Sequence, residues 1–77
     1  METDKINKII EETSPIGGEI RKNSKLKDEL GIDSMRLVEL LVMLEEAFSM
    51  EFALSDLNVR KFTVVNDIYK LISKYAG

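Results

Sequence analysis

The chain has 77 residues, of which 44% are hydrophobic and 32% charged, and this balance predicts one small globular domain over residues 1–77. Its 14 acidic and 11 basic residues give a net charge of −3, which disfavours nucleic acid as a partner because phosphates are bound by Lys and Arg. Cysteine and histidine do not occur, so disulfides, thiolate metal sites, a cysteine nucleophile and a histidine general base are excluded.

The first predicted helix carries Ile6, Ile9 and Ile10 on one face, because residues spaced three and four apart lie on the same side of a helix. Thr3 or Asp4 can cap its start. The helix is predicted to end at the Thr-Ser pair before the single proline, since a residue that precedes proline is pushed out of the helical region.

A long connection, residues 15–33, follows this helix and contains four basic residues. Such a length is unusual for a loop in a small domain, so part of the loop should pack on the core. We expect Leu26, Leu30 and Ile32 to hold its second half in place, with Gly31 allowing a tight turn.

Three further helices are predicted. The second runs from residue 34 to 48 or 49, the third is a turn or two that Ser55 caps and that ends before Phe62, and the last spans about 64–75. No segment alternates at period two for long enough to predict a strand. The predicted fold is therefore all-α, a small four-helix bundle of three main helices and one short helix with a long first loop.

The second helix has more apolar surface than one core face requires, because ten of residues 35–48 are apolar. One side gathers the residues predicted to face the core, which are Leu37, Leu40, Leu41, Leu44, Ala47 and Phe48. Met35, Val38 and Val42 fall nearly opposite. Three acids flank this second strip: Glu39, Glu45 and Glu46. An exposed apolar strip with an acidic rim indicates a docking surface for a protein, and the alternative is a central helix with neighbours on most sides.

Acidity is concentrated on this helix and the segment after it. Residues 33–56 hold six acids and one base, whereas residues 57–77 hold four bases and one acid. Such a patch would attract basic partner surfaces, and the alternative is an ordinary solvated helix face.

Ser34 lies where the long loop enters the second helix, next to Asp33. Both residues are good N-caps, so simple capping is one interpretation of the pair. The other is a phosphate ester on Ser34, which the partial positive charge of a helix N-terminus would favour. No histidine or G-x-S-x-G turn is available to activate this serine, so another protein would have to perform the chemistry.

Nearly the whole chain resembles an acyl carrier protein, most closely over residues 30–48. The residues that carry the resemblance are the segments LGIDSM (30–35), VEL (38–40) and LEEAF (44–48). The attachment motif of this family is usually Asp-Ser-Leu, and here it reads Asp33-Ser34-Met35.

This resemblance implies that Ser34 receives covalent 4′-phosphopantetheine from coenzyme A, added by a separate phosphopantetheinyl transferase. The thiol of that arm would carry acyl or aminoacyl groups as thioesters to loading, condensing or transferring enzymes, and Asp33 would help to set the local geometry. The positions that match partner-facing residues of the family are Met35, Val38, Glu39, Val42, Glu45, Glu46 and Phe52. The absence of cysteine agrees, because a carrier takes its thiol from the arm.

Some residues depart from the pattern of fatty-acid carriers. Arg36 places a positive charge two residues after Ser34, Ala53 stands where proline is common, and the connection from Phe48 to Phe62 is about two residues longer. The cargo therefore stays open between fatty acid biosynthesis and specialised polyketide, peptide or D-alanine pathways.

Other functions are weaker alternatives. An unmodified helical interaction module would use the same face of the second helix. Because the chain lacks His, Cys and a glycine-rich phosphate loop, we do not expect it to be an enzyme. The residue spacing of a calcium-binding loop is not present either. No secretory signal or membrane-spanning stretch is found, and the exposed apolar strip is flanked by acids rather than bases, so we expect a cytoplasmic monomer without membrane insertion.

Overall fold

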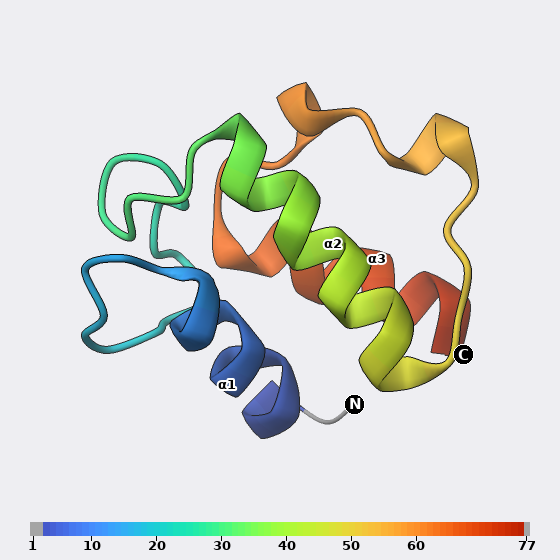
Figure 1. Cartoon of the computed structure of the whole chain (residues 1–77), viewed down its shortest axis with the longest axis horizontal. Coiled ribbons are helices and arrows are strands. Elements are labelled where there is room, and N and C mark those ends of the chain that lie inside the picture. Colours follow the sequence, from blue (N-terminus) through green and yellow to red (C-terminus); the bar gives the residue numbers. More distant parts are fainter. Residues whose placement is uncertain (1–2, 77) are drawn as a thin grey trace.

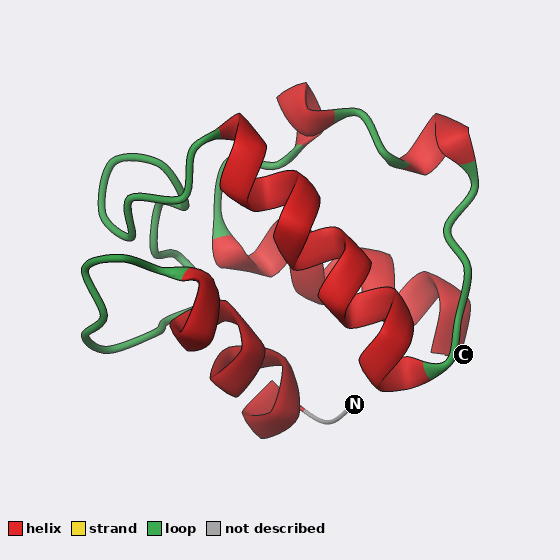
Figure 2. Cartoon of the chain, viewed as in Figure 1, coloured by secondary structure: helices red, strands yellow, loops and turns green. Residues whose placement is uncertain are grey.

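The computed structural model describes residues 3–76 and consists of three α-helices and two short 3-10 helices (Figures 1 and 2). In chain order these are α1 (Thr3–Thr13), α2 (Ser34–Phe48), η1 (Leu54–Asp56), η2 (Val59–Lys61) and α3 (Val65–Ala76). Residues 3–76 contain no β-strand, only an isolated antiparallel bridge between Lys25 and Val64. The predicted all-α fold is confirmed, and the short third helix takes the form of two separate 3-10 turns.

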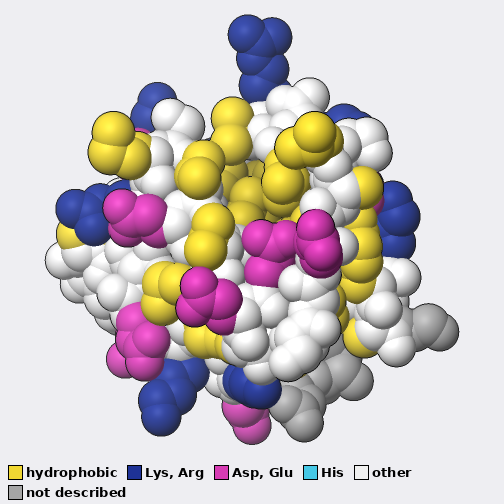
Figure 3. All heavy atoms as spheres, turned by 45° about the vertical axis from the view of Figure 1, so that its right-hand side comes forward, with side chains coloured by type: hydrophobic (Ala, Val, Ile, Leu, Met, Phe, Trp, Pro, Cys, Tyr) yellow, Lys and Arg dark blue, Asp and Glu magenta, His cyan; other side chains and the backbone are white. Residues whose placement is uncertain are grey.

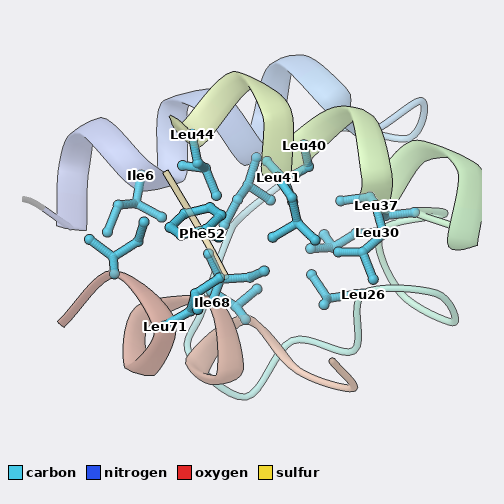
Figure 4. Close-up of a cluster of buried hydrophobic side chains, with 14 residues drawn as sticks. Ile6, Leu26, Leu30, Leu37, Leu40, Leu41, Leu44, Phe52, Ile68 and Leu71 are labelled. Carbon is cyan, nitrogen blue, oxygen red and sulfur yellow. The ribbon is translucent and has the colours of Figure 1, made fainter. Parts of the chain in front are cut away.

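The helix α2 crosses the middle of the molecule, with α1 on one side and α3 behind it (Figure 1). Side chains from the three helices and the long loop point toward one another between these elements (Figure 4). On α2 the buried residues are the four leucines predicted for the core face: Leu37, Leu40, Leu41 and Leu44. Ala47 and Phe48 on the same side are half-buried. This packing explains why α2, the most apolar helix, forms the centre of the fold.

The residues that flank α2 explain where this helix begins and ends. Asp33 precedes the helix in an extended conformation, and its carboxylate accepts the backbone N–H of Arg36 at 2.9 Å. At the other end Ser49 adopts the left-handed conformation, with φ 50° and ψ 46°, and its N–H is directed to the carbonyls of Glu45 and Glu46. A left-handed residue cannot continue a right-handed helix, so α2 stops there.

The long loop is fastened to the core as expected. Leu26, Leu30 and Ile32 are buried, and the backbone N–H of Leu26 donates to the carbonyl of Thr63 at 3.0 Å. Gly31 has φ 68°, and a Cβ there would lie 3.0 Å from a side-chain carbon of Pro15. This glycine therefore permits both a left-handed turn and close contact with the residues that follow α1.

The segment after α2 arches round the side of this helix that faces away from α1 (Figure 1). Ser55 does not cap its first turn as predicted, because it lies inside η1 and Ala53 occupies the cap position without a side-chain hydrogen bond. Hydrogen bonds with a side chain of α3 hold this segment in place instead. The hydroxyl of Tyr75 accepts the N–H of Ala53 at 2.7 Å and donates to Asp56 at 2.5 Å.

In the part of the chain that the structure describes, every helix is too short or too polar to cross a membrane.

Candidate functional site

Ser34 is the first residue of α2, and its side chain is exposed. The capping interaction is made by its neighbour Asp33, which accepts the N–H of Arg36. Within residues 3–76 no hydrogen bond engages the Ser34 hydroxyl. Of the two capping residues that the sequence offered, the fold therefore uses Asp33 and leaves the serine oxygen accessible to another molecule.

A surface pocket of about 240 Å³ opens beside this serine. It is bounded by the start of α2, the end of the long loop and η2, three parts of the chain that are distant in sequence. Its apolar walls are formed by Ile32, Leu37, Val59 and Phe62. Asp33 and Ser34 lie at one edge, and two cationic side chains, Lys27 and Arg60, complete the lining.

The charges around Ser34 favour an anion. The first turn of a helix has backbone N–H groups without intrahelical partners and a partial positive charge. Lys27 and Arg60 add two side-chain cations to the adjoining pocket. A phosphate ester on the Ser34 oxygen would therefore be placed next to compensating positive charge, and an apolar chain extending from it would find apolar walls.

The strip of α2 opposite the core is exposed, as predicted. Met35 is 73% exposed, Val38 51% and Val42 46%. The segment after α2 adds Leu54, whose side chain is 89% exposed. No helical periodicity in the sequence predicted this exposure. Hydrophobic side chains with acidic side chains among them cover one face of the molecule (Figure 3). Such surface is available for protein docking.

The three acids beside the strip differ in their surroundings. Glu39 and Glu46 are exposed, whereas Glu45 is half-buried. The carboxylate of Glu45 accepts the backbone N–H of Phe52 at 2.8 Å, so it fastens the following segment to α2. Glu45 also lines a small pocket of about 60 Å³ together with Val38, Val42 and Leu57. It therefore combines a structural role with a position at the exposed strip.

Phe52 requires a correction. The sequence predicted that it faces partners, but its side chain is only 5% exposed and lies in the core (Figure 4). Its ring makes an edge-on contact with Tyr75, with ring centroids 5.1 Å apart. The left-handed turn at Ser49 reverses the chain and directs this aromatic side chain inward, where it buries a large apolar area. The position lies outside any helix, so no periodicity indicated its direction.

Comparison with known proteins now places the chain in a family. Residues 4–72 match the family described as "Phosphopantetheine attachment site". An acyl carrier protein of Phytoplasma mali (strain AT) is 39% identical over 67 residues, covering 87% of this chain and 77% of the relative. This chain belongs to the acyl carrier protein family. An acyl carrier protein of Prochlorococcus marinus (strain MIT 9515) is 35% identical over 69 residues, which cover 90% of this chain and 84% of that protein.

The fold agrees with this assignment. A solved Mycobacterium tuberculosis structure, named provisionally as an acyl carrier protein, superimposes with a TM-score of 0.80 and 28% sequence identity. The superposition covers 92% of this chain and 93% of that chain. Members of the acyl carrier protein family hold 4′-phosphopantetheine covalently and act as carriers rather than as catalysts, working with phosphopantetheinyl transferases and acyl-handling enzymes. The residues around Ser34 fit such a group, because they combine a free hydroxyl, nearby cations and apolar walls.

Proposed function

We propose that Ser34 is the attachment site for 4′-phosphopantetheine in this acyl carrier protein. The observation that carries the proposal is an exposed hydroxyl without a hydrogen bond in the described chain, at the N-terminus of α2 and beside a pocket that contains two cations. In the transfer, the Ser34 oxygen would form a new bond to the phosphorus attached to pantetheine in coenzyme A. The pyrophosphate bond would break, adenosine 3′,5′-bisphosphate would leave, and the transferase would take the serine proton.

The chain's own residues would position the attached group. The N–H groups at the start of α2, with Lys27 and Arg60, would compensate the charge of the phosphodiester. Asp33 would hold the first turn of α2 in place through its bond to Arg36, and would thereby keep the serine outward. When bound, the group supplies the thiol that this cysteine-free chain lacks.

Partner enzymes would dock on the exposed strip of α2. Its apolar residues are Met35, Val38 and Val42. Its acids are Glu39, Glu45 and Glu46, of which Glu45 would contribute from a half-buried position. A partner with a basic surface would be attracted to these acids at long range, while the apolar side chains would be buried on contact.

The proposed role is to present acyl or aminoacyl thioesters in fatty acid biosynthesis or in a specialised pathway of the polyketide or peptide type. We propose that the chain does so as a single domain over residues 1–77, as a monomer in the cytoplasm. The relatives' names support a general acyl carrier. The departures from the fatty-acid carrier pattern at Arg36 and in the connection from Phe48 to Phe62 favour a specialised one.

Intact mass spectrometry tests the attachment site. The chain incubated with coenzyme A and a promiscuous phosphopantetheinyl transferase should gain the mass of one 4′-phosphopantetheine group. Ser34→Ala should gain none, whereas Ser55→Ala, a matched change at another exposed serine, should be modified like the wild type. If several transferases leave the wild-type mass unchanged, or if Ser34→Ala is still modified, the proposed site is wrong.

A further inference from the structure

The pocket beside Ser34 continues into a second one. This second pocket has a volume of about 280 Å³ and shares four lining residues with the first: Lys27, Val59, Arg60 and Phe62. Its remaining lining comes from Lys25 and Asp28 of the long loop and from Thr63, which lies between η2 and α3. The two pockets therefore form one groove that begins at Ser34 and runs between the long loop and η2. We call this the loop groove.

The side chains that line the loop groove carry an excess of positive charge. Lys25, Lys27 and Arg60 face two acids, Asp28 and Asp33. The carboxylate of Asp33 already accepts the N–H of Arg36. None of the three cations forms an ion pair with any residue between positions 3 and 76. Cations without a protein partner at a groove with apolar walls are suited to a ligand that has both an apolar stem and an anionic end.

We infer that the loop groove accepts the cargo of the arm and selects acyl groups whose free end is a carboxylate. This inference rests on the proposed attachment at Ser34. Lys27 and Arg60 line both pockets and would also face the phosphodiester at Ser34, whereas Lys25 lines only the second pocket. A carboxylate would receive charge-assisted hydrogen bonds from Lys25 and from whichever of Lys27 and Arg60 the phosphodiester does not engage. An aminoacyl cargo ends in an ammonium group, which the same cations repel. The groove thus favours anionic acyl cargo over the aminoacyl cargo that the sequence left open.

Three arms of similar length but different charge provide the test. Malonyl, butyryl and β-alanyl groups end in a carboxylate, a methyl and an ammonium group. Each is joined to the arm of a coenzyme A analogue by an amide in place of the thioester, which prevents hydrolysis, and is transferred to the chain. We expect the malonyl arm to shift the backbone amide resonances of residues 25–28 and 59–62 and to raise the melting temperature by about 4 °C or more over the β-alanyl arm, the size expected from one net hydrogen bond.

Charge-reversal variants show whether the groove itself is responsible. Lys27→Glu with Arg60→Glu should abolish the advantage of the malonyl arm. Lys8→Glu with Lys22→Glu changes the net charge equally at exposed positions outside the groove and should preserve that advantage. If the control pair abolishes it too, the effect is one of total charge and the inference is overturned.

The experiment distinguishes failure of the proposed attachment from failure of the charge selection. If no arm adds mass to the chain, the proposed attachment fails and the inference fails with it. If all three arms add mass but produce the same resonance shifts and melting temperatures, attachment stands and the charge selection by the loop groove is wrong.

Discussion

The carboxylate of Glu45 accepts the backbone N–H of Phe52 at 2.8 Å, and this hydrogen bond joins the exposed strip of α2 to the segment that leaves the helix. It holds the segment against α2 at the residue whose ring lies in the core. An acid that the sequence assigns only to partner docking therefore also stabilises the fold. A variant at Glu45 would change both properties, and loss of partner binding alone would not show that Glu45 contacts a partner.

Glu45→Ala should lower the free energy of unfolding by about 1–2 kcal/mol, because it removes a charged acceptor from a half-buried N–H. Glu45→Gln should lose less, since an amide oxygen can still accept that N–H. Urea denaturation measures both. The exposed neighbour provides the control, and Glu46→Ala should change stability by no more than about 0.5 kcal/mol. Equal losses at the two positions would contradict the structural role of Glu45.

Stability and modification should depend on different members of the Asp33-Ser34 pair. Asp33→Ala should cost about 1 kcal/mol of stability, because it removes the acceptor for the N–H of Arg36 at the start of α2. Ser34→Ala should leave the urea midpoint nearly unchanged while preventing modification. Asp33→Asn retains an acceptor and should recover most of the lost stability. A large destabilisation by Ser34→Ala would mean that the serine itself caps the helix.

The two faces of α2 should respond differently to truncation. Leu41→Ala and Leu44→Ala should each lower the free energy of unfolding by about 2–5 kcal/mol, because both side chains are buried. Val38→Ala and Glu39→Lys change exposed side chains and should leave the melting temperature nearly unchanged. These two should instead lower kcat/KM for the phosphopantetheinyl transferase. Equal destabilisation on both faces would show that the strip is part of the core.

The stability contributed by the hydrogen bonds between η1 and α3 should depend on pH. The hydrogen bond from Lys74, and to a smaller extent the one from Tyr75, holds the pKa of Asp56 below its ordinary value of 3.8. The hydrogen bond and charge of Asp56 in turn raise the pKa of Lys74 above 10.5. A lowered carboxyl pKa stabilises the fold fully above the ordinary value, and this contribution disappears as the pH falls through the lowered one. A raised lysine pKa gives the opposite sign, with a contribution that is lost as the pH rises through the raised value.

The difference in urea midpoint between wild type and Asp56→Ala should therefore be largest near neutral pH and shrink below pH 3.8 and above pH 10.5. A midpoint difference that stays constant from acid to alkaline pH would contradict the coupling between Asp56 and Lys74.

The helices and much of the candidate site could be predicted from the sequence because their signals are local. The spacing of Leu37, Leu40 and Leu44 predicts the core face of α2 whatever the neighbouring elements do. The same periodicity places Val38 on the opposite face. Ser34 follows from a capping pair at the start of an apolar helix, and the family resemblance rests on residues contiguous with it.

Only the tertiary structure decided which of Asp33 and Ser34 caps α2, that Phe52 lies inside, and that Lys27 and Arg60 line one groove. These features belong to irregular segments, or join residues far apart in the chain. Helical periodicity assigns a side chain to a face of its own helix, but an irregular segment has no such period. Its side-chain directions depend on turns such as the one at Ser49 and on contacts that form only when the helices pack.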